Sequence, residues 1–241
     1  NKVNKVYRVV EAFKPETSTS IEHQEVIDLL GKDGKICQEM VGFEDRPEQL
    51  RMAFAVTDAL NKHSITMVEA GTGTGKSLAY LVPAILWSLA NRERLVVSTN
   101  TINLQEQLIR KDLPFLQRAT GLDFQVVLVK GRSNYLCKRR LDSATAEPGL
   151  FDSEHIGELS ALREWAEQTG DGSREDLSFL PHKTVWEEVC CEADQCSRSQ
   201  CPHFGSCFFH QARRQAARAD ILVVNHALLL ADLSLRSQTD N

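Results

Sequence analysis

A short β-type run followed by a glycine-rich loop constrains this chain more than any other feature. "ITMVEA" (65–70) leads into "GTGTGKS" (71–77), and an apolar helix is predicted over 76–90. Glycine-rich loops between a strand and a helix bind phosphate through backbone N–H groups at the helix N-terminus. We therefore predict a nucleotide site, in preference to a merely flexible glycine loop, because both flanking elements are of the required type.

The individual residues of this loop have distinct expected roles. Glycines lacking Cβ atoms let the backbone wrap around a phosphate. Lys76 is expected to reach the β- and γ-phosphates of ATP, and Ser77 to ligate Mg²⁺; we assign these two residues as catalytic. Ala70 stands where the strict G-x-x-x-x-G-K-[ST] pattern has its first glycine. The predicted phosphate-binding residues are Gly71, Thr72, Gly73, Thr74, Gly75, Lys76 and Ser77.

Strands and helices alternate along much of the chain. Apolar strand candidates lie at 65–70, 94–99, 124–130 and 219–225, and helices are expected at 21–30, 46–63, 76–90 and 102–113, the last closed by Pro114. Strands that are apolar on both faces and separated by helices are typical of a parallel sheet. The expected fold class is therefore α/β, with a parallel sheet that carries the phosphate loop.

About ninety residues between the third and fourth strands have a different character. This segment has no strong strand pattern, a predicted helix at 155–168 and most of the cysteines. A connection of that length is unusual in a compact α/β domain, so we interpret it as an inserted subdomain. The expected organisation is an N-terminal extension of unknown role (1–41), a first part of the sheet domain (42–130), the insert (131–218) and a return to the sheet domain (219–241).

Composition and charge limit the partners and the cellular compartment that this chain can have. The chain has 241 residues, 42% of them hydrophobic, and a net charge of −5. No bulk positive field indicates nucleic acid, so any such contact must come from local basic patches. No apolar signal region is visible at the N-terminus, and the longest apolar run (78–90) is too short to span a membrane. We expect a cytoplasmic protein with no membrane partner, a compartment in which clustered cysteines bind metal more often than they form disulfides.

Five of the seven cysteines fall within "CCEADQCSRSQCPHFGSC" (190–207). Cys196, Cys201 and Cys207 are separated by four and five residues, and Cys137 lies 59 residues upstream of Cys196. Zinc sites usually contain two close pairs, whereas four thiolates are what a [4Fe–4S] cluster needs. We favour the cluster and keep zinc as an alternative. Cys190 and Cys191 are interpreted as bystanders that could substitute as ligands, and Cys37 as a buried apolar filler.

Several stretches in order resemble one family. "VEAGTGTGKSLAYLVPA" is followed by "VVSTNTINLQEQL", then "VKGRSNYLC", the cysteine group and "ARADILVVNHALLLADL". This order resembles DinG-type helicases, bacterial relatives of the XPD-like iron–sulfur helicases of superfamily two, over residues 42–236. The resemblance implies a RecA-like first motor domain, incomplete here, with an inserted iron–sulfur subdomain whose ligands are Cys137, Cys196, Cys201 and Cys207.

The resemblance also implies nucleotide and DNA contacts. Arg46 and Gln49 match the Q motif that contacts adenine. Motif Ia, which touches single-stranded DNA, matches Thr99, Thr101, Asn103 and Gln105; capping of a helix by threonine is the plain structural alternative. Basic residues beside the cysteines could follow a DNA backbone or form a solvated face. Those assigned to DNA are Lys138, Arg139, Arg213 and Arg214.

The expected function is the N-terminal part of an ATP-dependent DNA helicase that moves 5′ to 3′ in DNA repair. Its expected partners are ATP, Mg²⁺, single-stranded DNA and a single-stranded-DNA-binding protein. No D-E-A-H-like acidic run is present, so we expect these 241 residues not to hydrolyse ATP efficiently by themselves. The alternatives are a non-catalytic nucleotide- and DNA-binding module, and a zinc-stapled P-loop protein.

Overall fold

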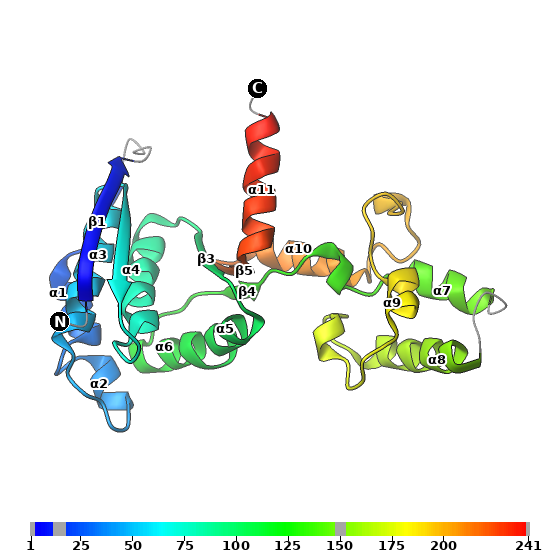
Figure 1. The fold of residues 1–241 in the computed structure, drawn as a ribbon, viewed down its shortest axis with the longest axis horizontal. Coiled ribbons are helices and arrows are strands. Elements are labelled where there is room, and N and C mark those ends of the chain that lie inside the picture. The colour runs from blue at the N-terminus through cyan, green and yellow to red at the C-terminus, as the bar shows by residue number, and fades with distance from the viewer. Residues whose placement is uncertain (1–2, 12–17, 148–152, 240–241) are drawn as a thin grey trace. The chain divides into compact units, whose positions relative to one another are not determined.

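The computed structural model describes residues 3–11, 18–147 and 153–239, and the ribbon of Figure 1 traces the chain. The chain divides into two compact units, here called the sheet unit (1–128 with 219–241) and the cysteine unit (129–218). The elements of the sheet unit are β1 (Val3–Glu11), α1 (His23–Leu30), α2 (Lys35–Glu39), α3 (Pro47–Asn61), β2 (Ser64–Ala70), α4 (Lys76–Asn91), β3 (Leu95–Thr99), α5 (Ile102–Gln107), α6 (Leu113–Thr120), β4 (Val126–Leu128), β5 (Ile221–Asn225) and α11 (His226–Thr239).

A three-stranded parallel sheet lies in the sheet unit, in the order β3–β5–β4. Ile221, the first residue of the central strand β5, pairs with Leu95 on one side and with Val126 on the other. Its side chain is fully buried. Three parallel strands connected through helices confirm the predicted α/β class.

The strand that carries the glycine loop is an exception to the prediction. β2 pairs antiparallel with β1 rather than joining the parallel sheet. The expectation that 65–70 belongs to that sheet is therefore wrong for this structure, because the N-terminal segment supplies the backbone hydrogen bonds of β2. Its side chains alternate in burial, and Ile65 and Met67 are exposed.

Two smaller predictions are also corrected. Pro114 does not end the helix that begins at Ile102, since the chain passes through a π-helical turn (Leu108–Asp112) into α6. Pro114 is the second residue of α6 and directly follows this π-helical turn, a local change in hydrogen bonding that lets a helix continue past a proline. Cys37 is half-buried rather than buried.

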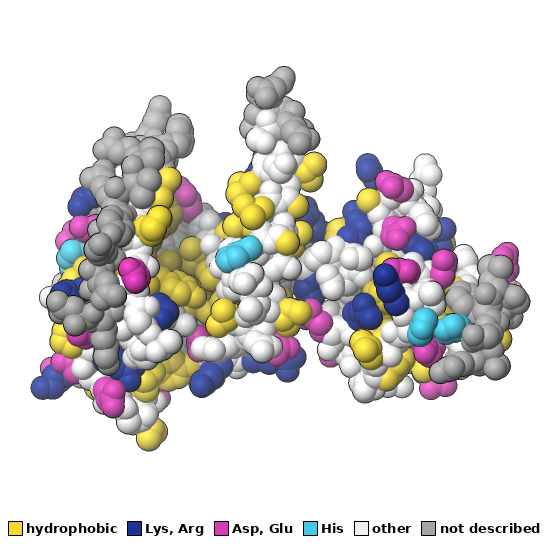
Figure 2. Space-filling view, in the orientation of Figure 1, with side chains coloured by type: hydrophobic (Ala, Val, Ile, Leu, Met, Phe, Trp, Pro, Cys, Tyr) yellow, Lys and Arg dark blue, Asp and Glu magenta, His cyan; other side chains and the backbone are white. Residues whose placement is uncertain are grey.

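Helices cover the core of the sheet unit. α3 packs against β2 and α4, and α1 packs against α3 and α4. The core contains buried aliphatic side chains from α4, α6 and the parallel strands, among them Leu81, Ile85, Leu116, Ile221 and Val223. α11 instead shows exposed leucines to solvent (Figure 2), at positions 230, 233 and 235. Over the described residues, none of the helices combines the length and apolarity that a membrane crossing needs.

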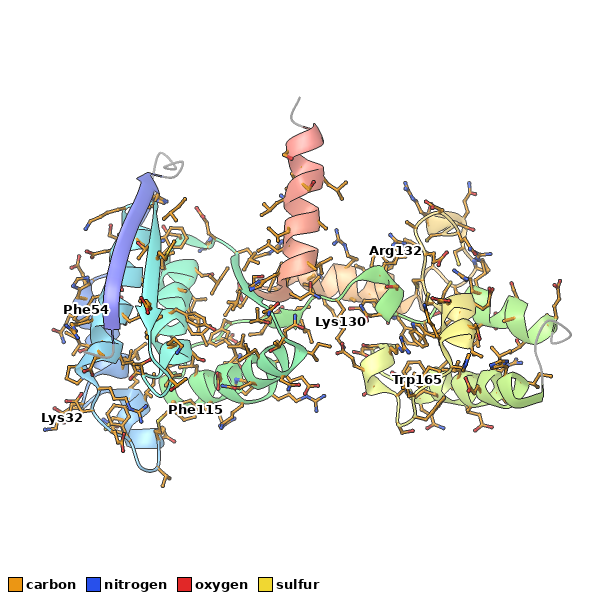
Figure 3. All side chains as sticks on the ribbon, viewed as in Figure 1. Lys32, Phe54, Phe115, Lys130, Arg132 and Trp165 are labelled. Carbon is orange, nitrogen blue, oxygen red and sulfur yellow. The ribbon has the colours of Figure 1, made fainter. Side chains whose placement is uncertain are left out.

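The cysteine unit is mainly helical. Its helices are α7 (Lys138–Ala146), α8 (Ser153–Gln168), α9 (Lys183–Val189) and α10 (Phe208–Arg218). Its own core contains Leu136, Leu162, Trp186 and Phe208, with Trp165 packed against it (Figure 3). Lys130 donates to Ser173 and pairs with Glu175 at 2.9 Å, which fixes the first residues of the unit.

The helical core of the cysteine unit gives a stability prediction. Leu162 is fully buried, so Leu162→Ala should lower the free energy of unfolding by about 2–5 kcal/mol. Leu180 is 83% exposed, and Leu180→Ala should change it by no more than about 0.5 kcal/mol. Chemical denaturation followed by circular dichroism measures both, and equal effects would contradict the assigned core.

Candidate functional site

The glycine loop connects β2 to α4 in a conformation that only glycine adopts easily. Gly73 and Gly75 have φ of 78° and 75°, and Gly75 is the N-cap of α4. Thr74 is buried and donates to the carbonyl of Gly71 at 2.8 Å. The first backbone N–H groups of a sixteen-residue helix thus follow directly on the loop, an arrangement suited to a phosphate.

Lys76 is exposed and folds back over this loop. Its Nζ donates to the carbonyl oxygens of Ala70 and Gly71, at 3.1 and 2.8 Å. A phosphate oxygen is a stronger acceptor for an ammonium group than a neutral carbonyl. Lys76 is therefore held over the loop in a position from which it can exchange carbonyl oxygens for an anion.

Gln49 and Ser77 make different hydrogen bonds at and beside the loop. Gln49 is 4% exposed, and its Nε2 donates to the carbonyl of Gly75 at 2.9 Å. The hydroxyl of Ser77 hydrogen-bonds to Tyr80, whose pKa is raised by burial and by the nearby charge of Asp112. Arg46, by contrast, pairs with Glu44 rather than with the loop. Contact of Gln49 and Arg46 with adenine stays a prediction.

The four residues assigned to motif Ia differ in exposure. Thr99 and Gln105 are buried. Thr101 caps α5 by accepting the N–H of Leu104, and Asn103 is exposed on the first turn of that helix. The hydroxyl of Thr99 donates to the carbonyl of Thr101 at 3.3 Å. Contact of these four residues with DNA stays a prediction.

In the cysteine unit, two short extended segments lie side by side. The N–H of Cys137 donates to the carbonyl of Val189, and the N–H of Cys191 donates to that of Tyr135, both at 2.8 Å. Leu136 and Val189 are fully buried and anchor the two segments in the core. This pairing brings Cys137 beside Cys191, although 53 residues of sequence separate them.

Five cysteines line one small cavity, which we call the cysteine chamber. They are Cys137, Cys191, Cys196, Cys201 and Cys207. The loop from 192 to 207 surrounds the chamber in successive turns. In these turns the N–H of Cys196 donates to the carbonyl of Ala193, and the N–H of Cys201 donates to the carbonyl of Arg198. Arg198 has a φ of 49°, a strained value for a residue with a side chain. All four predicted ligands therefore lie at the same cavity.

Two of these thiols are held where a negative charge is favoured. Cys137 is the N-cap of α7, and Cys207 directly precedes α10. The pKa of each thiol is lowered, mainly by a hydrogen bond from Cys191. Backbone N–H groups at the start of the following helix lower it further. For Cys137 this is the N–H of Arg140, and for Cys207 the N–H groups of His210 and Phe209. The pKa of Cys191 is raised, because its side chain hydrogen-bonds to Cys137 and Cys207 and is buried. Cys137 and Cys207 are thus prepared as thiolates, the form that binds metals.

The chamber also contains a polar atom without a partner. Among the described residues, the buried Nε2 of His210 makes no hydrogen bond, and His210 lines the chamber. Its ring lies against Phe204 and Phe209, with centroids 4.7 and 5.7 Å away. Buried ring nitrogens ordinarily have a partner. An acceptor bound within the chamber would supply one.

The chamber does not gather its side chains around a single point. Within the described parts of the chain, no group of three or more His, Cys, Asp or Glu side chains is placed to hold one metal ion. Tetrahedral zinc requires four ligand atoms at about 2.0–2.3 Å from one ion. A four-iron cluster distributes its four cysteine ligands over separate irons.

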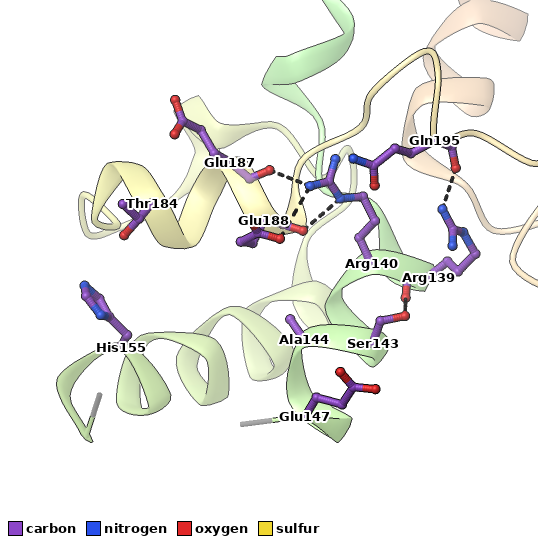
Figure 4. Close-up of a pocket in the computed structure, with 10 residues that line it drawn as sticks. All are labelled: Arg139, Arg140, Ser143, Ala144, Glu147, His155, Thr184, Glu187, Glu188 and Gln195. Carbon is purple, nitrogen blue, oxygen red and sulfur yellow. Dashed lines mark hydrogen bonds and ion pairs between the residues drawn. The ribbon is translucent and has the colours of Figure 1, made fainter. Parts of the chain in front are cut away.

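Basic residues near the chamber have two kinds of surroundings. Arg140 is buried and donates to the carbonyls of Glu187 and Glu188 at the end of α9 (Figure 4). Arg139 donates to the carbonyl of Gln195, next to Cys196. Both arginines therefore tie α7 to the elements around the chamber, whereas Arg213 and Arg214 on α10 are exposed. Lys138 is half-buried, with its Nζ 4.5 Å from the ring centroid of Phe208.

Comparison with known proteins places these sites in a family. A DEAD/DEAH box helicase family model matches residues 52–169. The ATP-dependent DNA helicases YoaA of Haemophilus influenzae and Escherichia coli are 36% and 39% identical to the chain, over 88% and 87% of its length. The ATP-dependent helicase DinG of Mycobacterium tuberculosis is 40% identical over 80% of the chain.

The chain belongs to the DinG/YoaA family. This confirms the family predicted from the sequence motifs. The chain spans about a third of the length of these relatives, namely 33%, 32% and 32%. The parallel α/β sheet of the sheet unit is consistent with the RecA-like helicase domain of this family.

Two residues of the chamber in this DinG/YoaA chain are missed by sequence reasoning. The sequence pattern groups Cys191 with Cys190 as a bystander that could substitute as a ligand, and His210 is given no role there. The run of two cysteines carries no signal for which thiol faces the chamber, because that depends on how residues 189–191 pair with residues 135–137. For His210, the available signal is its position three residues after Cys207, within the first turn of α10.

The loop geometry predicts unequal effects of two glycine substitutions. Both glycines have left-handed backbone conformations, so replacing either one by alanine should destabilise the loop by about 1–2 kcal/mol. At Gly75 the Cβ would also collide with the amide of Gln49, whereas at Gly73 it meets nothing within 4 Å. Gly75→Ala should therefore reduce the free energy of unfolding by at least about 1 kcal/mol more than Gly73→Ala.

Chemical denaturation of the two variants measures this difference. Adding Gln49→Ala to Gly75→Ala removes the colliding amide and should recover part of the loss. Equal stability of the two single variants would show that Gln49 is not packed on Gly75.

Proposed function

We propose that this chain is the N-terminal part of an ATP-dependent DNA helicase that binds ATP with Mg²⁺, single-stranded DNA and a [4Fe–4S] cluster. The observation that carries the proposal is the presence, in one DinG/YoaA-type chain, of an ordered phosphate loop and a chamber lined by four cysteines of the predicted spacing. The relatives named ATP-dependent helicases support ATP and DNA as ligands. Movement from 5′ to 3′ and a role in repair follow from the family resemblance.

At the phosphate loop, the chain's own residues can bind and orient a triphosphate. Lys76 would move from the carbonyls of Ala70 and Gly71 to the β- and γ-phosphate oxygens. Backbone N–H groups of the loop and the α4 N-terminus would hold the same phosphates. Ser77 would turn from Tyr80 to ligate Mg²⁺, and Gln49 would keep Gly75 in its left-handed conformation.

The chemistry of hydrolysis needs groups that the phosphate loop lacks. An ATPase uses an acidic pair to hold Mg²⁺ and to position water, and the 241 residues contain no D-E-A-H-like run. We therefore propose that this chain alone binds nucleotide and turns it over slowly.

The residues of the chamber suit a cluster. Cys137 and Cys207 are prepared as thiolates at helix N-termini, and Cys196 and Cys201 on the surrounding loop complete four thiol ligands. A [4Fe–4S] cluster bound there would join α7, α10 and the 192–207 loop and so stabilise a unit with a small core. Zinc is the competing occupant, and it is colourless where a cluster is brown.

The nucleotide site is tested by binding ATP with Mg²⁺ to the whole chain. Lys76→Ala removes the charged group of the loop and should weaken binding at least about tenfold, or about 1.4 kcal/mol. Lys32→Ala, at an exposed lysine outside the loop (Figure 3), removes the same charge and should leave affinity unchanged. Isothermal calorimetry measures both. Unchanged affinity in Lys76→Ala would contradict the site, and rapid DNA-stimulated turnover by wild type would contradict the proposed slow hydrolysis.

The binding of DNA is tested on the exposed arginines of α10. Arg213→Ala with Arg214→Ala should weaken binding of a single-stranded oligonucleotide and reduce the slope of log affinity against log salt by about 0.7 for each phosphate that the variant no longer neutralises. Arg163→Ala with Lys183→Ala removes two charges from other exposed positions of the same unit and serves as the control. Fluorescence anisotropy across a salt series gives both quantities. Equal effects of the two pairs would assign the arginines of α10 to a solvated face.

A further inference from the structure

The loop from 192 to 207 is not held in place by hydrophobic burial. It carries three of the four predicted ligands, yet none of its residues is buried. The core of the cysteine unit includes Cys191 and Phe208, the residues that directly flank the loop, but no residue of the loop itself. Its position within the unit must therefore be fixed mainly by polar contacts with neighbouring elements.

Those polar contacts end on one helix, α7. Arg139 donates from Nη2 to the carbonyl of Gln195 (Figure 4). His203 donates from Nε2 to the carboxylate of Asp142 at 2.7 Å. Among the described residues, every hydrogen bond or ion pair that joins residues 192–206 to another element has its partner on α7. One helix therefore determines where this loop lies.

The same helix begins at the fourth predicted ligand and is itself firmly held. Cys137 is the N-cap of α7. Arg140 is only 7% exposed and fixes the helix to α9 by donating to the carbonyls of Glu187 and Glu188. It also pairs with Glu192 at 3.2 Å, where the loop begins. α7 is thus a fixed support, against which more exposed contacts close the loop.

The other walls of the chamber belong to the core of the unit. Leu136 and Phe208, beside the first and last predicted ligands, are buried, so these walls cannot move without loss of packing. The side chains of His203 and Asp142 are 32% and 56% exposed, and exposed pairs contribute little free energy. Segments with little burial open locally at low free energy. Movement of the loop away from α7 is therefore the least costly way to uncover the chamber.

We propose that α7 clamps the loop from 192 to 207 over the chamber through Asp142 and Arg139, and that a metal group enters and leaves the chamber when this loop opens. Both residues are positioning residues for Cys196 and Cys201, which lie between the two points of contact. The clamp rests on the contacts described above, whereas the route of the metal also rests on the proposed cluster.

Asp142 offers a set of matched variants. Asp142→Ala removes the carboxylate that His203 contacts, whereas Asp142→Asn keeps an oxygen that can accept the hydrogen bond. Alanine has a higher helix propensity than aspartate, so a looser loop in Asp142→Ala would not reflect a weaker α7. Glu164→Ala removes a carboxylate from an exposed position on α8 and is the control.

Thiol labelling measures the loop itself, in the whole chain without metal. Alkylation by iodoacetamide is followed for each cysteine peptide by mass spectrometry, with Cys37 in the sheet unit as the internal reference. Loss of one exposed contact should make Cys196 and Cys201 react about two- to fivefold faster in Asp142→Ala. Asp142→Asn and Glu164→Ala should react as wild type does. Equal rates in Asp142→Ala and wild type would overturn the clamp, as would equal acceleration in Asp142→Asn.

Removal of iron measures the route, in the whole chain purified without oxygen. Wild type and Asp142→Ala should start with the same iron content and visible spectrum, because all four predicted ligands remain. An iron chelator should then bleach Asp142→Ala about two- to fivefold faster than wild type or Asp142→Asn. An unchanged bleaching rate would overturn the route. Absence of iron from wild type would refute the proposed cluster and the route with it, while the labelling rates would still decide the clamp.

Discussion

The pairing of residues 135–137 with residues 189–191 is the interaction on which the cysteine unit depends. Two backbone hydrogen bonds of 2.8 Å join these segments across more than fifty residues of sequence. They fix where α7 begins and where α9 ends, and so they set the positions of Cys137 and Cys191. The loop from 192 to 207 then needs to span only the chamber before α10 starts at Phe208. Without this pairing, the cysteines would be distributed along a flexible connection whose closure has an entropic cost.

The same electrostatic device serves both units. In the sheet unit the N-terminus of α4 follows a glycine loop, where we propose that a phosphate binds. In the cysteine unit the N-termini of α7 and α10 face the thiols of Cys137 and Cys207. Each helix offers unpaired N–H groups and the positive end of its dipole to an anion. A phosphate and a thiolate are different anions, yet backbone N–H groups at a helix N-terminus can stabilise either one.

Local features of the structure could be predicted from the sequence, and features set by long-range contacts could not. The glycine loop and the helices beginning near Pro47 and Lys76 follow from spacing and periodicity over a few residues. The cysteine spacing and the family resemblance together point to Cys137, Cys196, Cys201 and Cys207, which the structure places at one cavity; their role as ligands stays a prediction. The pairing of β2 with β1 depends on a segment that has little pattern of its own. The burial of Gln49 depends on Gly75, 26 residues later, and the direction of Cys191 depends on Leu136. The effect of Pro114 depends on the π-helical turn that precedes it, which the sequence pattern does not specify.

We propose that the chamber holds an iron–sulfur cluster in a chain that also binds nucleotide. The most direct measurement is the metal content of the chain purified without oxygen, together with its visible absorption, in wild type and in Cys201→Ser. We expect a brown wild-type protein with about four irons and four sulfides per chain, and a marked loss of both in the variant. A colourless protein with one zinc per chain, or negligible iron in wild type, would contradict it.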